Sequence, residues 1–402
     1  MGSPPLAKRL EAVKPSATVA ITDRARQLKA DGKDVISFSV GEPDFGTPEH
    51  IQKAAIDSIV GGKASHYTAA RGIVELRQAI CEDSARRRGG QRHQPNEVVV
   101  SVGAKHTLFN LALALYDEGD EVIVPAPYWV SYPEHAAIVG AKPVIVETTQ
   151  EGGFRLTPEA LRKAVTPKTK ALVLCTPSNP TGAAYAPEHL AELAEVIREG
   201  SYWVIVDEMY SELVYGGFEQ RSLLEIAPDL RERLIIVDGV SKTYAMTGWR
   251  IGWMLGPAHV AAACDKVQGQ STTNPTAAAQ WAAVAALTGP REPIEAMRKQ
   301  FEERRAVIVE EMNQIPGFDC RVPEGAFYAF PSVKGLIGKK ADGVVLADDV
   351  AVCTYLLEKA GVALVPGTAF GAPGFLRMSY ATSVEIIREG LRRIREAVEA
   401  LD

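Results

Sequence analysis

Three polar side chains, each at the end of a short apolar run, have the types needed for covalent catalysis. Lys242 ends "RLIIVDGVSK", Asp207 follows "WVIV", and Asn179 follows "ALVLCTPS". A lysine at the end of a buried strand loses hydration, which lowers its pKa and makes it a better nucleophile toward an aldehyde. Arg250 adds a second cation in the same stretch, "GVSKTYAMTGWRIG". The sequence therefore predicts a covalent site around Lys242 that also binds an anion.

Pyridoxal phosphate is the aldehyde that best matches these groups, and it requires three further contacts. An anion must keep its pyridine nitrogen protonated so that the ring accepts electrons, and Asp207 is placed for this role. Tyr210 and Asn179 can donate to the phenolic oxygen, and Trp129 can stack on the ring. The phosphate needs a helix N-terminus and a cation. The candidates for this contact are Gly103, Ala104, Lys105, Ser241 and Arg250.

The elements that must position these residues are indicated by an alternation of apolar runs and helical patterns. Segments that contain apolar runs lie at 97–102, 120–127, 170–182, 201–210 and 233–242, with helical patterns between several of them. This alternation predicts βαβ units and a mainly parallel, buried sheet. Ligands of such sheets bind outside the carboxyl ends of the strands. We therefore expect the candidate residues to lie together at one edge of the sheet.

The pattern changes after about residue 290, which indicates a second domain. The segment 291–315 reads as a long charged helix with an apolar stripe that bridges two domains, and a smaller α+β pattern follows it. We expect a large domain over 47–292 and a small domain formed by 1–46 and 293–402.

Composition excludes several other classes of protein. The net charge of −6 argues against a nucleic-acid surface, and the basic run "RRRGGQR" at 86–92 is interpreted as a solvated helix end with a Gly-Gly stop. The 5 cysteines are widely spaced without a CxxC motif, and the histidines show no paired spacing. We therefore expect reduced thiols and no metal site. No apolar run is long enough for a membrane span and the start resembles no signal peptide, so a cytoplasmic protein is expected.

The stretch "GVSKTYAMTGWRIG" resembles the lysine signature of the class I aminotransferases. "SVGAKHTLFN", "SNPTG" and "DEMY" stand in the order and spacing of that family, and the similarity runs from Lys14 to Ser383. The resemblance implies fold-type I: an α/β large domain with a mainly parallel seven-stranded sheet between helices, plus a smaller α+β domain. It also implies a pyridoxal-phosphate homodimer with shared active sites. Lys242 would form the Schiff base and move the proton, with Asp207 and Tyr210 as the other catalytic residues.

The same resemblance assigns further residues. Tyr67 would cross the subunit interface to the partner's phosphate, and Gly41 would lie beside the substrate. Arg377 in "FLRMSY" would bind the substrate α-carboxylate as a fork, next to Trp129 and Asn179. The Asn179–Pro180 bond is expected to be cis.

The residues around Lys105 favour an acidic substrate. A distal carboxylate needs a cation, and residues 251–290 lack the Arg that animal-type aspartate aminotransferases use. Lys105 stands in "GAK", as in a bacterial and plant branch of aspartate aminotransferases, where it acts with hydroxyls equivalent to Ser16 and Thr18. Some members of that branch also convert prephenate to arogenate. We therefore expect a ping-pong exchange of the amino group between L-aspartate and 2-oxoglutarate, which gives oxaloacetate and L-glutamate.

Other functions remain to be weighed. An aromatic, alanine-type or kynurenine aminotransferase, or a C–S lyase, would keep the fold and change the substrate. A pyridoxal-binding transcription regulator is disfavoured, because about 40 residues before "GEPDF" leave no room for a DNA-binding domain. A nicotinamide dehydrogenase is disfavoured because no GxGxxG occurs.

Overall fold

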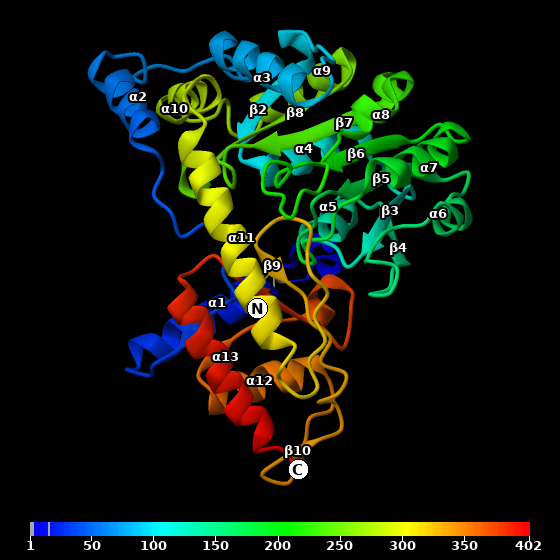
Figure 1. The fold of residues 1–402 in the computed structure, drawn as a ribbon. Coiled ribbons are helices and arrows are strands. Elements are labelled where there is room, and N and C mark those ends of the chain that lie inside the picture. The colour runs from blue at the N-terminus through cyan, green and yellow to red at the C-terminus, as the bar shows by residue number, and fades with distance from the viewer. Residues whose placement is uncertain (1–3, 15–16) are drawn as a thin grey trace.

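A seven-stranded sheet is the largest element of the computed structural model, which describes residues 4–14 and 17–402 (Figure 1). The strand order is β2-β8-β7-β6-β5-β3-β4, and only β8 among these strands runs antiparallel to its neighbours. The strands are β2 Val98–Val102, β3 Glu121–Ala126, β4 Lys142–Glu147, β5 Thr169–Cys175, β6 Trp203–Asp207, β7 Leu234–Gly239 and β8 Ile251–Leu255. The carboxyl ends of the parallel strands and the amino end of β8 therefore lie at one edge, as expected.

Helices cover both faces of this sheet because side chains along each strand alternate between two buried clusters. Val98 and Val100 of β2 pack into one cluster, whereas Val99 packs into the other. The first face is covered mainly by α2 Glu49–Val60, α3 Val74–Arg87, α7 Pro187–Arg198, α8 Leu223–Ile226 and α10 Ala277–Thr288, with α6 Pro158–Ala164 at its side. The second face is covered by α4 Ala104–Leu115, α5 Ser131–Ile138 and α9 Ala258–Gly269.

A smaller group of elements lies below the sheet in Figure 1. Its three-stranded antiparallel sheet has the order β13-β14-β9. A short parallel pair joins β1 of the N-terminal segment to β12. The elements are α1 Ala17–Ala30, β1 Ile36–Ser37, β9 Tyr328–Ala329, β10 Lys340–Ala341, β11 Val344–Val345, α12 Asp349–Lys359, β12 Val362–Ala363, β13 Val365–Pro366, β14 Leu376–Ser379 and α13 Val384–Glu399.

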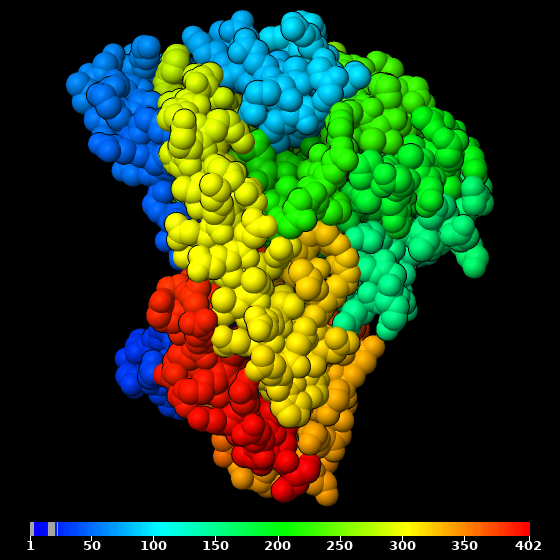
Figure 2. Space-filling model, viewed as in Figure 1, coloured from blue at the N-terminus to red at the C-terminus, as the bar shows by residue number. Residues whose placement is uncertain are grey.

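The long helix predicted from the sequence is confirmed as α11, Glu292–Met312. It runs from the large sheet to the smaller group of elements, and its outer side lies on the surface in Figure 2. Its buried residues, which include Phe301 and Ile308, form the expected apolar stripe. The proposed domain limits at 46/47 and 292/293 stay a prediction.

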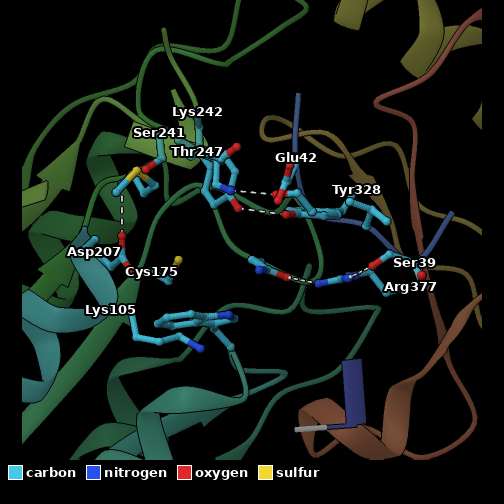
Figure 3. Close-up of a pocket in the computed structure, with 18 of the residues that line it drawn as sticks. Ser39, Glu42, Lys105, Cys175, Asp207, Ser241, Lys242, Thr247, Tyr328 and Arg377 are labelled. Atoms are coloured by element: carbon cyan, nitrogen blue, oxygen red, sulfur yellow. Dashed lines mark hydrogen bonds between the residues drawn. The ribbon is translucent and has the colours of Figure 1, made fainter. Parts of the chain in front are cut away.

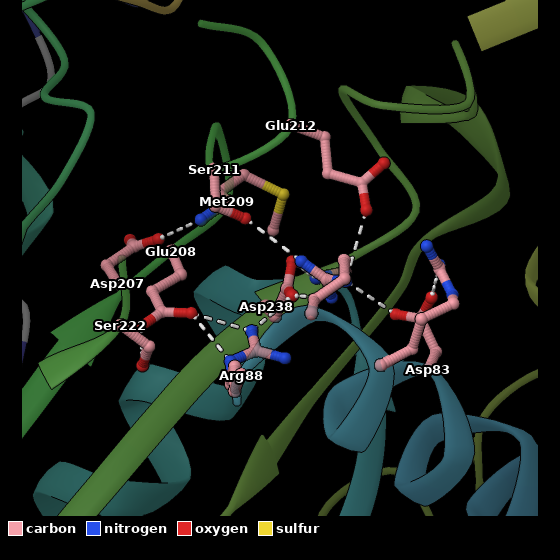
Figure 4. Close-up of polar contacts among 12 residues, drawn as sticks. Asp83, Arg88, Asp207, Glu208, Met209, Ser211, Glu212, Ser222 and Asp238 are labelled. Carbon is pink, nitrogen blue, oxygen red and sulfur yellow. Dashed lines mark hydrogen bonds and ion pairs between the residues drawn. The ribbon is translucent and has the colours of Figure 1, made fainter. Parts of the chain in front are cut away.

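The basic run at 86–92 was interpreted wrongly as a solvated helix end. Helix α3 does end at Arg87, and Gly89 and Gly90 have positive φ, as a Gly-Gly stop requires. Arg88, however, is only 1% exposed. Its guanidinium binds the carboxylates of Glu208 at 2.7 Å and Asp238 at 2.9 Å (Figure 4). The chain turns inward here because those two carboxylates, at the ends of β6 and β7, must be compensated.

Two general expectations concern the thiols and the membrane. The five cysteines are all free thiols in the structure, as expected from their spacing. Within the described ranges, no helix combines the length and the apolar character that a bilayer crossing requires.

Candidate active site

A cavity of about 640 Å³ lies at the strand edge, between the large sheet and the smaller group of elements. Most of the predicted site residues line it, although they come from distant segments (Figure 3). They are Gly41, Ala104, Lys105, Trp129, Asn179, Asp207, Tyr210, Ser241, Lys242, Arg250 and Arg377. The strand-end argument therefore predicted which residues come together at this edge, and their roles stay a prediction.

Lys242 reaches the cavity from the loop that follows β7. Its Nζ donates to the carbonyl oxygen of Gly41 at 2.7 Å. Burial lowers its pKa to about 8; Glu42 opposes this shift, and Arg250 adds to it. No carboxylate of the described residues forms an ion pair with Nζ. The neutral amine, which acts as a nucleophile or a base, is therefore reached at a lower pH than in an ordinary lysine.

Asp207 is a buried carboxylate at the end of β6. Its Oδ2 accepts a hydrogen bond of 2.8 Å from the hydroxyl of Tyr132, and its Oδ1 accepts one of 3.1 Å from the backbone N–H of Met209. Burial raises its pKa to about 6, although both hydrogen bonds favour the ionised form. A positive group next to this carboxylate would reverse that shift.

The first turn of α4 forms a cradle with the amino end of β8. Gly103 precedes α4 with φ of 81°, and a Cβ atom there would lie 2.6 Å from Nη2 of Arg250. A Cβ atom at Gly252 would collide with the backbone nitrogen of Ala104. The first N–H groups of α4 face the cavity together with Arg250 and the hydroxyl of Ser241. This set of donors fits a phosphate.

Arg377 of β14 presents an unusual guanidinium. It lies between the rings of Tyr328 and Phe370, at 4.8 and 5.1 Å from Cζ to the ring centroids. Nη1 donates to Asn179 Oδ1 at 3.0 Å and Nη2 to the carbonyl of Ser39 at 2.6 Å, whereas Nε has no partner in the described part of the chain. The Asn179–Pro180 bond is cis, as predicted. Stacked and without a carboxylate, Arg377 fits a substrate carboxylate.

Lys105 extends from the second position of α4 to the opposite side of the cavity from Arg377 (Figure 3). Its Nζ lies over the ring of Trp129, 4.9 Å from the centroid, and burial followed by Arg250 lowers its pKa. Ser16 lies outside the described residues. Thr18 falls within α1, and Arg26 of the same helix lines the cavity.

Tyr67 is not brought to the cavity within one chain. Its side chain is 88% exposed, in the segment that follows α2. The exposed apolar residues of α2 are Ile56, Ile59 and Val60.

Tyr132 and Tyr328 are among the cavity residues that the sequence reasoning missed. Tyr132 stands three residues after Trp129 in "WVSY", so the helical spacing could have indicated that it lies one turn away. Tyr328 lies in "FYAFP", an aromatic run typical of a core strand, which gave no signal of a site.

Known proteins share both the sequence and the fold. The profile described as "Aminotransferase class I and II" matches residues 33–394. The aspartate aminotransferase of Geobacillus stearothermophilus is 46% identical, with 98% of this chain and 99% of the relative covered. A protein of Rhizobium leguminosarum bv. phaseoli named probable aspartate/prephenate aminotransferase is 48% identical, with 97% and 98% covered.

Solved structures agree with these relatives. The aspartate aminotransferase from Rhizobium meliloti superposes with a TM-score of 0.96 at 44% identity, and the match covers 100% of both chains. The aspartate aminotransferase from Thermus thermophilus with maleate superposes with a TM-score of 0.92 at 43% identity, covering 98% of this chain and 100% of the other. Sequence, fold and cavity therefore lead to one conclusion: the chain belongs to the aminotransferase class I and II family.

Proposed function

We propose that this protein is a pyridoxal-phosphate-dependent aminotransferase that exchanges the amino group between L-aspartate and 2-oxoglutarate. The observation that carries the proposal is the convergence of Lys242, Asp207 and Arg377 on one cavity, with neither cation paired to a carboxylate among the described residues. Relatives at 46% and 45% identity are named aspartate aminotransferase, which supports the substrate.

The residues of the cavity fit the cofactor. Pyridoxal phosphate, when bound, supplies an electron sink for the carbanion at the substrate Cα. The α4 cradle with Ser241 and Arg250 would hold its phosphate, and Asp207 would hold the proton on its ring nitrogen. Tyr210 and Asn179 would donate to its phenolic oxygen, and Lys242 is the attachment amine.

The chain's own residues then bind the substrate and move its proton. Arg377 would receive the α-carboxylate through the Nη protons that Asn179 and Ser39 leave free, since the rings of Tyr328 and Phe370 restrain the guanidinium. Lys242, once neutral, would take the proton from the substrate Cα, because burial depresses its pKa. Trp129 would exclude water on one side of the cavity.

Lys105 is the cation proposed to bind the distal carboxylate of the substrate. The hydroxyls of Ser16 and Thr18 would bind the same carboxylate. The same group would accept prephenate, which also has two carboxylates, and two relatives at 48% and 46% identity are named for both substrates. The decisive measurement is kcat/KM for oxaloacetate, prephenate and phenylpyruvate with glutamate as donor. If phenylpyruvate is preferred, the aromatic alternative replaces this proposal.

Lys105→Ala tests the role of the cation directly. Loss of a charge-assisted hydrogen bond should lower kcat/KM for oxaloacetate about 10- to 100-fold relative to that for pyruvate. Lys266→Ala is the control, because Lys266 is exposed on α9. An unchanged ratio in Lys105→Ala would remove Lys105 from the specificity argument.

We further propose a cytoplasmic homodimer in which Tyr67 reaches the partner's phosphate site. Its 88% exposure and the apolar residues on α2 support an interface there. Ile59→Glu should shift the sedimentation coefficient to that of a monomer. Ile386→Glu, on the exposed side of α13, should sediment like the parent protein.

A further inference from the structure

Tyr328 contacts both the part of the cavity that is proposed to bind the cofactor and the part that is proposed to bind the substrate. Its hydroxyl lies 2.9 Å from the hydroxyl of Tyr210, and both side chains are buried. Tyr328 comes from β9 and Tyr210 from the loop after β6, so the bond joins the small three-stranded sheet to the edge of the large sheet.

The ring of Tyr328 faces Arg377 at the same time. Cζ of Arg377 lies 4.8 Å from the Tyr328 centroid and 5.1 Å from the Phe370 centroid. A guanidinium between two aromatic rings is restrained in its plane. Removing the Tyr328 ring therefore frees one face of the group that would bind the α-carboxylate.

The Tyr328 hydroxyl also lies against the segment that binds Lys242. A Cβ atom on Gly41 would lie 2.6 Å from this hydroxyl oxygen, and the carbonyl oxygen of Gly41 accepts the hydrogen bond from Lys242 (Figure 3). The bonds Tyr328–Tyr210, Gly41–Lys242 and Arg377–Asn179 thus all join residues that line the cavity.

The direction of the bond between the two phenols follows from the role proposed for Tyr210, because either hydroxyl could donate. A tyrosine hydroxyl has a single proton to donate. If Tyr210 donated it to Tyr328, none would remain for an acceptor in the cavity. The hydrogen bonds among the described residues give the Tyr328 hydroxyl no acceptor other than Tyr210. Tyr328 must therefore be the donor if Tyr210 is to act on a ligand.

We propose that Tyr328 is a positioning residue: its hydroxyl donates to Tyr210, which frees the Tyr210 proton for the cofactor's phenolic oxygen, and its ring orients Arg377. This inference rests on the proposed function, because Tyr210 needs an acceptor in the cavity. It also separates the two roles of one side chain, since the hydroxyl serves the cofactor and the ring serves the substrate.

Tyr328→Phe tests the hydroxyl while the ring is kept. The readout is the pH midpoint of the visible absorption spectrum of the holoenzyme, which reports how well the phenolic oxygen is stabilised as an anion. Loss of the hydrogen bond from Tyr328 to Tyr210 should raise the pH midpoint by about half a pH unit. The KM for aspartate should change less than about threefold, because Arg377 remains stacked. The other titratable groups that face the two phenols are Cys175, Glu42 and Arg377, which the substitution leaves in place.

Tyr328→Leu tests the ring. It should give the same spectral shift and, in addition, raise the KM for aspartate about tenfold, because one face of Arg377 is then open. Tyr380→Phe is the matched control. Tyr380 is also a buried tyrosine, but its hydroxyl donates to the carbonyl of Ala326 at 3.1 Å, away from the cavity. It should change neither the midpoint nor the KM.

A midpoint that does not move in Tyr328→Phe would overturn the proposal, as would an equal shift in Tyr380→Phe. A parent protein that takes up no pyridoxal phosphate would overturn the proposed function instead, and this inference with it.

Discussion

Two buried arginines of this protein both pack on aromatic rings, but only one of them is paired with a carboxylate. Arg377 lies between Tyr328 and Phe370, and Arg304 of α11 packs on Phe45 and Phe301 at 4.9 and 5.5 Å. Arg304 also forms a fork with Asp44, with distances of 2.7 and 3.0 Å. Arg377 has no carboxylate partner among the described residues. Aromatic stacking alone therefore does not mark a ligand site; the missing anion does.

The contrast extends to whole clusters. Arg87 and Arg88 each bind more than one carboxylate: Arg87 pairs with Asp83 and Asp238, and Arg88 pairs with Glu208 and Asp238 (Figure 4). Of the cations that line the cavity, Arg26 pairs with Asp23, whereas Lys105, Lys242, Arg250 and Arg377 have no carboxylate partner in the described ranges. One cluster was neutralised when the chain folded, and the other is completed only by ligands.

Loss of the Lys242 amine should have the largest effect of any single change. Lys242→Ala is expected to lower kcat about ten-thousandfold, because both the attachment amine and the base are removed. Lys266→Ala should retain full activity. The rate of the absorbance change in a single turnover with aspartate is measured for both variants. A fast turnover in Lys242→Ala would show that another cation performs the chemistry.

Exchanging Arg377 and Arg304 for methionine tests the comparison most directly. Arg377→Met should lower kcat/KM for aspartate about thousandfold and change the free energy of unfolding by less than about 1 kcal/mol, since no carboxylate is stranded. Arg304→Met should lower that free energy by about 1–3 kcal/mol, because Asp44 loses its partner, and leave kcat/KM within about threefold. Equal losses of stability in the two variants would break the comparison.

Arg88→Met tests the same comparison in the cluster whose charges are already paired. It removes the ion-pair partner of buried Glu208 and one of the two partners of Asp238, which keeps Arg87, so the free energy of unfolding should fall by about 3 kcal/mol. Denaturant unfolding measures this value, with Arg92→Met as the control, because Arg92 belongs to the same basic run and is exposed. An unchanged midpoint in Arg88→Met would mean that the network contributes nothing to stability.

The smallest expected effect is the dependence of pyridoxal phosphate uptake on pH. Burial lowers the pKa of Lys242 to about 8, so the amine is protonated and unreactive below that pH. The rate at which the cofactor-free protein takes up pyridoxal phosphate should rise about tenfold per pH unit below 8 and level off above it. A stopped-flow pH series measures this rate. A midpoint near the ordinary lysine value would mean that a neighbouring anion, such as Glu42, keeps the amine charged.

The sequence predicted what depends on local pattern. Apolar runs ending in Asp207 or preceding Lys242 placed both residues at one edge of the sheet, Arg250 was noted as a second cation in the same stretch as Lys242, and the class I resemblance pointed to Arg377. The sequence did not reveal Arg88, because a basic run before Gly-Gly has the pattern of a solvated helix end. Its partners lie far along the chain, at Glu208 and Asp238.

The same limitation applies to side chains that act through a neighbour. Tyr328 and Tyr210 are separated by 118 positions, and nothing in "FYAFP" distinguishes a site residue from a core residue. The pairing becomes visible only once β9 and the loop after β6 are placed in space.

The reversed direction of β8 fixes the length of the segment between Lys242 and Arg250. The segment leaves the strand edge after β7, carries the amine into the cavity, and returns through Arg250, whose φ of 58° is left-handed, to start β8. Gly103 and Gly252 leave no space for a different path, because a side chain at either would meet the opposite backbone or guanidinium. An insertion of even one residue here would move the amine relative to the phosphate cradle. Length variation among natural or engineered variants is therefore to be sought elsewhere, such as in the exposed turn between β10 and β11.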